Sequence, residues 1–182
     1  MQRSAFLFLG ALFLAVVGCG GSDDSGHSGS AGTVLGAYEN GHPITMKTVS
    51  SSTLQLESEV VRIVNEHRVA LGMNALVARP SIADVARGHS VHMTVHNFFA
   101  HENPEGDTPG ARISKGGVAW SMAGENLAAG YSTPESAFVA WMNSPGHKEN
   151  IEREGWVFTG VGYWHDSEAP YQYYWTQNFS KP

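Results

Sequence analysis

The chain has 182 residues, a formal net charge of −6 at pH 7 and a single cysteine. Its acidic and basic residues are scattered singly, without a basic cluster, which argues against nucleic acid or a polybasic membrane contact. A single cysteine excludes a disulfide within the chain, so packing alone must stabilise the fold.

The first residues have the pattern of an export signal. Arg3 precedes an apolar run over residues 6–17, which is shorter than the about 20 residues that a membrane-spanning helix needs. The run leads through Val-Val-Gly into Cys19 and resembles the bacterial lipobox, in which the cysteine becomes lipidated and N-terminal. We therefore expect a lipoprotein signal peptide over residues 1–18 and lipidation of Cys19. The alternative is a conventional signal followed by a chance thiol.

The next segment, residues 19–53, is rich in glycine and serine, a composition typical of a flexible linker. We expect it to be a lipid-anchored tether that does not order itself. Two short apolar pieces within it, 34–38 and 43–46, are candidates for docking on the domain. Residues 54–182 remain, a typical length for one domain with one core.

The front half of the domain predicts helices. Helical periodicity starts at Leu56 and ends before Gly72, which predicts a first amphipathic helix. A second helix is expected after Pro80, with Ser81 as N-cap and Asp84 three residues further on. Its predicted inner face consists of Ile82, Val85, Ala86, His89, Met93 and His96. A short third helix is expected over residues 109–115.

The back half of the domain predicts two more helices and a hairpin. Thr133-Pro134 is a strong helix start, for a helix running to about Asn143, and Ser144-Pro145 repeats the signal. The runs 156–164 and 171–179 are aromatic and β-branched, which predicts an antiparallel hairpin. The element order predicts an α+β domain with helices packed on an antiparallel sheet.

Six motifs follow one another along the domain and together resemble one family. The motifs are His89-Ser90-x-x-Met93, Phe98-Phe99-Ala100-His101, Gly124-Glu125-Asn126, Trp141-Met142-Asn143-Ser144-x-Gly146-His147-x-x-Asn150-Ile151, Gly160-Val161-Gly162-Tyr163 and Tyr174-Trp175-Thr176-Gln177. In this order they resemble the CAP superfamily of cysteine-rich secretory proteins, venom allergens and plant pathogenesis-related proteins, and its disulfide-free bacterial branch in particular. The resemblance implies a three-layer α-β-α sandwich with a central antiparallel sheet and a cleft lined by two histidines and two acids.

Carried over by motif, the first histidine of that cleft is His101, its first acid is Glu125 and its second histidine is His147. The place of the second acid holds Asn143-Ser144, so the set of two histidines and two acids is incomplete. The resemblance thus implies a ligand-binding cleft formed by these five residues. The catalytic residues, if a reaction occurs, would come from the two histidines and Glu125.

Two neutral imidazoles and one carboxylate have the composition of a three-ligand zinc site. His101, Glu125 and His147 are therefore candidate ligands for zinc or another divalent metal. Alternatively, a histidine would act as general base with Glu125 orienting it. The domain contains no Gly-x-Ser-x-Gly, no His-Glu-x-x-His and no cysteine, and hence no recognised nucleophile motif.

Structural roles compete with these functional ones. Glu125 and Asn126 would equally suit a buried polar network or a capped turn. His89 is expected to be a hydrogen-bonded core histidine, whereas His92 and His96, spaced i and i+4, would bind a metal only with a third partner. The tryptophans and the last tyrosines are expected in the core and the sheet rather than in a carbohydrate platform.

The leading hypothesis is an extracytoplasmic CAP-domain lipoprotein, anchored to the cell membrane or outer membrane through lipidated Cys19. Its cleft would bind a small ligand, namely a lipid, a peptide or a divalent metal ion, without catalysis and without a nucleic-acid partner. The second hypothesis is a metal-assisted hydrolase acting on envelope peptides or peptidoglycan. The third is a structural or interaction module, in which His101→Ala would destabilise the fold but leave the biological effect intact.

Overall fold

The computed structural model describes residues 35–39, 42–45 and 49–182, with side chains from residue 49 onward. The predicted signal peptide and Cys19 lie outside the described residues. Within the predicted tether, β1 (Leu35–Glu39) and β2 (His42–Thr45) pair as a two-stranded antiparallel sheet. The predicted tether thus contains two paired strands. No helix in the described part of the chain has the length and apolarity that crossing a membrane requires.

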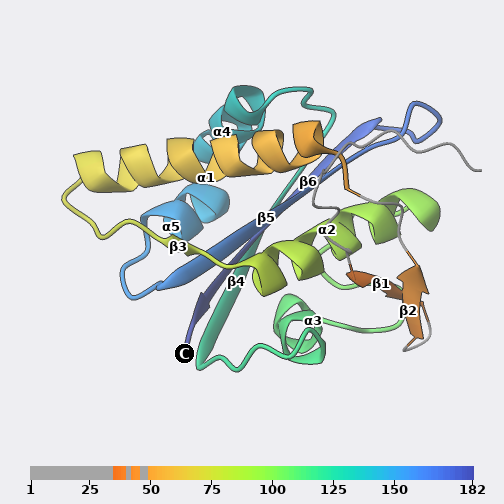
Figure 1. Cartoon of the computed structure of the whole chain (residues 1–182). Coiled ribbons are helices and arrows are strands. Elements are labelled where there is room, and N and C mark those ends of the chain that lie inside the picture. The colour runs from red at the N-terminus through yellow and green to blue at the C-terminus, as the bar shows by residue number, and fades with distance from the viewer. Residues whose placement is uncertain (1–34, 40–41, 46–48) are drawn as a thin grey trace, which may run out of the picture. The chain divides into compact units, whose positions relative to one another are not determined.

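A four-stranded sheet forms the centre of the domain, in the order β3-β5-β6-β4 (Figure 1). β5 pairs with β6, and β6 with β4, in antiparallel fashion, while the short β3 runs parallel to β5. The sheet is thus antiparallel except at this one edge. The strands are β3 (Val77–Ala78), β4 (Met122–Ala129), β5 (Phe158–His165) and β6 (Tyr173–Lys181).

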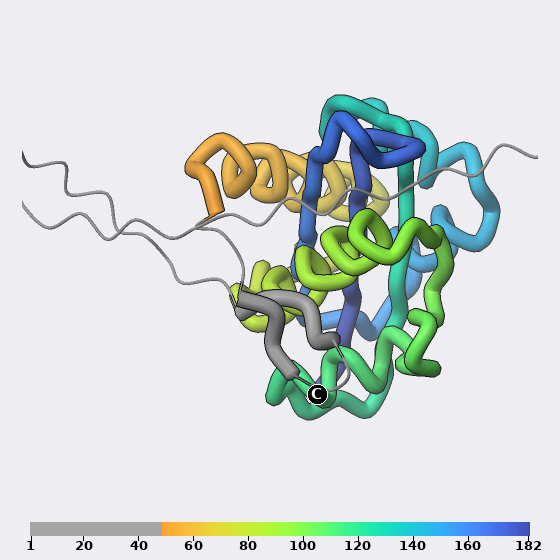
Figure 2. Tube along the Cα trace, turned by 90° about the vertical axis from the view of Figure 1, so that its right-hand side faces the viewer, coloured from red at the N-terminus to blue at the C-terminus, as the bar shows by residue number. Residues whose placement is uncertain are grey.

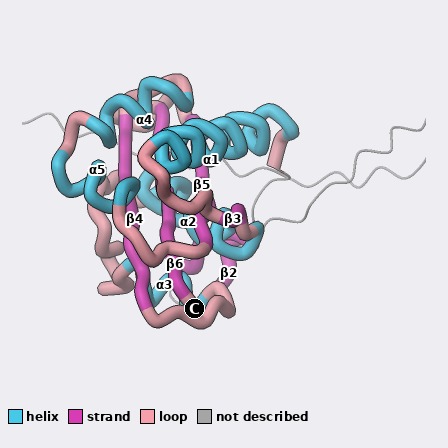
Figure 3. Tube along the Cα trace, turned by 90° about the vertical axis from the view of Figure 1, so that its left-hand side faces the viewer, coloured by secondary structure: helices cyan, strands magenta, loops and turns pink. Residues whose placement is uncertain are grey.

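Five helices cover the two faces of the sheet. They are α1 (Ser51–Ala70), α2 (Pro80–Val95), α3 (Pro109–Lys115), α4 (Pro134–Met142) and α5 (Pro145–Glu152). α1, α4 and α5 contact one another, and α2 contacts β5, β6 and α3. Figure 2 shows α2 crossing the three long strands, and Figure 3 shows α1 lying over β5 on the side of α4 and α5. This arrangement confirms the predicted three-layer α-β-α sandwich.

The core is divided between the two faces because successive side chains of a strand point to opposite sides. Trp175 and Phe179 of β6 pack with Val60 of α1 and Trp141 of α4 in one buried cluster. The side chain of Tyr174 points to the opposite face of β6 and packs with Met93 of α2. The tryptophans at 141, 156 and 175 are buried, as predicted for core residues.

Two glycines of β5 allow the backbone of α2 to pack directly against the backbone of the sheet. A Cβ atom added at Gly162 would lie 1.9 Å from the amide nitrogen of Arg87, and one at Gly160 would lie 2.2 Å from that of Ala83. A side chain at either position would overlap the helix backbone. The Gly-x-Gly motif of β5 therefore fixes the spacing between α2 and the sheet.

The predicted helices are largely confirmed, with corrections at two N-termini. α1 begins at Ser51, where the hydroxyl of Ser50 accepts from the amide of Thr53 at 3.1 Å, so the predicted boundary at residue 54 falls within this helix. α2 has Arg79 rather than Ser81 as N-cap and no side-chain cap. The remaining helices begin where predicted, and Thr133 caps α4 through the amide of Ser136.

The buried surface of α2 and the presence of β4 differ from the sequence-based expectation. Residues 86–94 of α2 are all buried, so the buried surface extends around the helix rather than along one face. Phe98, which follows the helix, makes ring contacts with His89 and His92. β4 is absent from the predicted elements, although it carries Glu125.

Candidate functional site

A buried carboxylate forms the centre of the candidate site. Glu125 lies on β4, is 5% exposed, and accepts hydrogen bonds at both of its oxygens. Nδ1 of His101 lies 2.9 Å from Oε1, and Nη2 of Arg112 donates to Oε2 at 2.6 Å. An ionised carboxylate only accepts hydrogen bonds, so we assign the proton of this bond to Nδ1 of His101. In the neutral ring the lone pair is then on Nε2.

The environment keeps Glu125 ionised. Burial acts to raise the pKa of Glu125, but the hydrogen bond from His101 and the positive charge of Arg112 outweigh it, so the pKa lies below its usual value. The nearby His89 adds to this lowering. The carboxylate is therefore a permanent acceptor for His101 at neutral pH.

His89 lies behind the carboxylate as a neutral core residue. Its Nε2 donates to the carbonyl oxygen of Ala100 at 3.0 Å and lies 4.0 Å from Oε1 of Glu125. Burial lowers the pKa of His89 to about 4, although the charge of Glu125 acts in the opposite direction. The predicted role of His89 as a hydrogen-bonded core histidine is confirmed.

Arg112 connects the carboxylate to the loop that carries His101. Its Nη1 donates to the carbonyl oxygens of His101 and Asp107, both at 2.7 Å. The carboxylate of Asp107 in turn accepts from Nζ of Lys115, with 2.6 Å to Oδ2. Arg112 was not among the residues predicted for the site, because one arginine in a short helix carries no motif that distinguishes it.

The second histidine reaches the site through two asparagines. Nδ2 of Asn150 donates to the carbonyl of Glu125 at 3.1 Å and to Oδ1 of Asn126 at 3.0 Å. Nδ2 of Asn126 donates to the carbonyl oxygen of His147 at 3.0 Å. These bonds attach α5 to β4 and bring the ring of His147 to 6.4 Å from that of His101, measured between centroids.

The pKa of His147 is lowered by its partial burial and by the charge of His101. Its ring therefore stays neutral, with a free lone pair, to a lower pH than an ordinary histidine. His101 and His147 together present two imidazoles beside each other, and the side chain of His101 is 53% exposed.

The other two predicted ligand-binding residues lie at the junction of α4 and α5. Asn143 is the C-cap of α4, and Ser144 is the N-cap of α5 without a side-chain cap bond. Within the described residues, neither side chain hydrogen-bonds to the histidine pair or to Glu125. Of the five predicted residues, His101, Glu125 and His147 are thus the three that contacts connect.

The three residues do not fit a three-ligand zinc site in this arrangement. Both oxygens of Glu125 accept hydrogen bonds, and the guanidinium of Arg112 at Oε2 would repel a cation at this carboxylate. In residues 49–182 no three His, Cys, Asp or Glu side chains are arranged to hold a metal ion. Glu125 therefore acts as a partner of His101 rather than as a ligand, which leaves the two imidazoles as potential donors.

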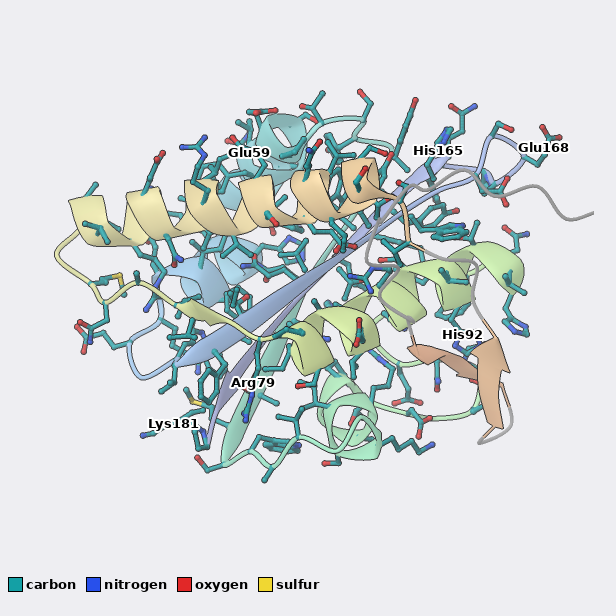
Figure 4. All side chains as sticks on the ribbon, viewed as in Figure 1. Glu59, Arg79, His92, His165, Glu168 and Lys181 are labelled. Carbon is teal, nitrogen blue, oxygen red and sulfur yellow. The ribbon has the colours of Figure 1, made fainter. Side chains whose placement is uncertain are left out.

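The i, i+4 histidine pair of α2 lies elsewhere on that helix. The rings of His92 and His96 are 4.4 Å apart between centroids, and Nε2 of His92 is 3.5 Å from Oε1 of Glu105. Figure 4 shows His92 on the C-terminal half of α2. Among the described side chains, neither histidine belongs to a group of three His, Cys, Asp or Glu residues that could hold a metal ion.

The arrangement favours recognition through imidazole nitrogens. With Nδ1 bound to Glu125, Nε2 of His101 can accept a hydrogen bond or a proton from a ligand beside His147. Among the described residues, no serine, threonine or cysteine side chain hydrogen-bonds to either histidine. The histidine pair is therefore equipped to bind a ligand and to act as a base.

Comparison with curated proteins gives two relatives from Bacillus subtilis (strain 168). The chain is 34% identical over 135 residues to the uncharacterized protein YkwD, covering 74% of this chain and 51% of that protein. It is 33% identical over 125 residues to the uncharacterized membrane protein YlbC, covering 69% of this chain and 34% of that protein. The chain thus spans about half or less of the curated relatives that it matches.

Among solved structures, an extracellular protein containing an SCP domain from Bacillus anthracis str. Ames is 29% identical, with a TM-score of 0.64. The match covers 78% of this chain and 47% of that one. An outer surface protein from Borrelia burgdorferi shares the fold with a TM-score of 0.65 at 22% identity, over 75% of this chain and 97% of that one. A model of the CAP cysteine-rich secretory protein family matches residues 61–179. The chain therefore belongs to the cysteine-rich secretory protein (CAP) family.

Proposed function

We propose that the protein is an extracytoplasmic, lipid-anchored CAP-domain protein that binds a small ligand at His101 and His147. The observation that carries the proposal is the bond between Glu125 and Nδ1 of His101, which directs Nε2 away from the buried carboxylate. A buried ionised carboxylate is costly unless its partners are well placed. An exposed imidazole oriented by such a group is suited to contact a molecule from solution.

Binding is favoured over a reaction because no serine, threonine or cysteine side chain among the described residues hydrogen-bonds to either histidine. The carboxylate is also buried and hydrogen-bonded to His101 and Arg112, which disfavours direct activation of a water molecule by Glu125. The ligand classes that suit paired imidazoles are a lipid or peptide with a polar group, or a divalent metal held by two nitrogens.

Native mass spectrometry of the full-length protein, purified from the envelope of its own host, tests the proposal. A bound mass is expected in the wild type and is expected to be lost in both His101→Ala and His147→Ala. Val139→Ala, which changes an exposed residue of α4, serves as the control and should retain the bound mass. A wild-type protein without any bound mass, or binding unchanged in both histidine variants, would contradict the proposal.

The second candidate function is hydrolysis of envelope peptides or peptidoglycan with His101 as general base. The observation in its favour is that the same bond to Glu125 leaves a basic nitrogen at Nε2, as a general base requires. Incubation of the purified protein with peptidoglycan and with peptides distinguishes the two functions. Release of fragments that depends on His101 would favour the hydrolase, whereas retention of a ligand without turnover favours binding.

The anchoring part of the proposal rests on the sequence before the described residues. An apolar run over 6–17 that leads into Cys19 is typical of a lipoprotein signal. The extracellular and outer-surface descriptions of two structural neighbours are consistent with export. The third hypothesis, a structural or interaction module, predicts that His101→Ala lowers stability and leaves the biological effect intact.

A further inference from the structure

We propose that Arg112 is the positioning residue of the candidate site, holding the Glu125 carboxylate and the backbone of His101 in one fixed geometry. This inference rests on the proposed function, in which the two histidines contact the ligand. It assigns a role to a residue that lies on α3 and outside the sequence motifs of the site.

A single guanidinium bonds three acceptors from two parts of the fold. Nη2 of Arg112 donates to Oε2 of Glu125 on β4, at 2.6 Å, while Nη1 donates to the carbonyl oxygens of His101 and Asp107, at 2.7 Å. Arg112 itself is only 8% exposed. The planar arrangement of its donors permits these bonds at the same time, in fixed relative directions. The carboxylate and the main chain that carries the ring are therefore held to the same rigid group.

The side chain of His101 cannot hold this position by packing, because 53% of it is exposed. A second anchor of the same loop joins Asp107 to Lys115, with 2.6 Å between Oδ2 and Nζ. This anchor restrains the loop but involves the carboxylate of Asp107, not that of Glu125. Of the two anchors from α3, Arg112 is the one that couples the loop to Glu125.

The charge of Arg112 also supports the ionised carboxylate that keeps the proton of His101 on Nδ1. Glu125 is buried, and burial favours the neutral carboxyl unless a positive charge compensates it. An ionised carboxylate only accepts, and thus holds the proton of His101 on Nδ1, whereas a neutral carboxyl can donate as well. Without Arg112, the ring would no longer be restricted to the tautomer that presents Nε2 as an acceptor.

The test reads the tautomer of His101 directly, by the nitrogen chemical shifts of its ring in the ¹⁵N-labelled full-length protein at pH 7.5. The His101→Ala variant assigns the signals. The wild type is expected to show His101 in the Nδ1–H form, and Arg112→Met to reduce that population at least twofold. Lys115→Met is the matched control, since it removes a cation from the same helix and loosens the same loop, and should leave the tautomer unchanged.

Arg112→Lys serves if Arg112→Met does not fold, because it keeps a cation but not the planar set of donors. It is expected to lose part of the Nδ1–H population. An Nδ1–H form retained in full in both variants, or lost equally in Lys115→Met, would overturn the proposal.

The outcome for Arg112 is separable from the outcome for ligand binding. If Arg112→Met changes the ring as expected but native mass spectrometry finds no bound mass in the wild type, the positioning role stands and the proposed function fails. If the bound mass depends on His101 while the ring is insensitive to Arg112, the proposed function stands and the positioning role fails.

Discussion

Glu57 of α1 and Arg87 of α2 form a buried ion pair around the edge of the sheet, with 2.6 Å between Oε2 and Nη2. Oε1 of Glu57 also accepts from Nε of Arg87 at 2.7 Å and from the backbone amide of Tyr163 at 3.0 Å. The pair therefore joins the two helical layers where β3, which reaches only Phe158 and Thr159, no longer covers β5.

Removing the charge of Glu57 should strongly destabilise the protein. Glu57→Gln leaves the guanidinium of Arg87 buried, with Asp84 as its remaining acidic partner among the described side chains, and breaking a buried pair costs about 3–5 kcal/mol. The free energy of unfolding, measured by urea titration, is the quantity to compare. Glu59→Gln, on the outer side of α1 (Figure 4), is the control and should have a much smaller effect, because the ion pair of Glu59 with Arg62 is at the exposed surface. Equal effects of both variants would show that the ion pair is dispensable.

Trp141 tests the packing of α4 against the sheet. The residue is 0% exposed, so Trp141→Ala is expected to lower the free energy of unfolding by about 3–5 kcal/mol through lost burial and a cavity. Val139, two residues earlier and 53% exposed, provides Val139→Ala as the control with little effect. A loss below about 1 kcal/mol for the tryptophan variant would be incompatible with its place in the core.

Gly162 tests the close approach of α2 to β5. The added Cβ of Gly162→Ala would lie 1.9 Å from a backbone atom of Arg87, so the helix must move and the thermal midpoint should fall by several degrees. Gly146 of α5 has no atom within 4 Å of such a Cβ, so Gly146→Ala should keep or slightly raise the midpoint. Calorimetry of both variants measures the two midpoints. An unchanged midpoint in Gly162→Ala would show that Gly162 is not needed for the close approach of α2 to β5.

The burial of His89 should make the free energy of unfolding depend on pH. Its pKa is lowered to about 4 by burial, whereas the unfolded chain binds a proton near 6.5, so the unfolded state carries more protons between these values. Stability contributed by neutral His89 is thus present above pH 6.5 and is lost as the pH falls to about 4. The difference corresponds to about 3 kcal/mol. Unfolding free energies of wild type and His89→Gln across this range provide the check, and parallel curves would contradict it.

Lipidation remains a sequence-based prediction, since Cys19 lies outside the described residues. Cys19→Ser removes the thiol that would carry the lipid, so the variant should move from the membrane fraction to the soluble fraction. Fractionation followed by immunoblotting of both forms measures the change. A Cys19→Ser protein that still sediments with membranes would show that something other than a lipid holds it.

Local signals in the sequence were sufficient for most helices and for the hairpin. Thr133-Pro134 and Ser144-Pro145 mark helix starts by chemistry that acts within one turn, and the structure confirms both positions. β4 could not be found in this way, because Met-Ala-Gly-Glu-Asn-Leu-Ala-Ala has little intrinsic strand preference. Its extended form depends on pairing with β6, which is distant in the sequence.

The candidate site was predictable only in part. The family motifs singled out His101, Glu125 and His147, and the structure joins the first two by a hydrogen bond and the two histidines by ring proximity. The expectation that Glu125 is a third metal ligand did not anticipate Arg112, whose contact with the carboxylate depends on tertiary structure. The two asparagines that attach α5 to β4 belong to the motifs, but their partners were not evident from spacing.

The two-residue length of β3 has a consequence for association between molecules. Beyond β3, the edge of β5 would offer free amide and carbonyl groups on which a strand of another molecule can pair. The carboxylate of Glu57 occupies the amide of Tyr163 at this edge, and an incoming strand would have to displace a buried charge from Arg87. The ion pair thus blocks this edge of β5 against pairing with a further strand.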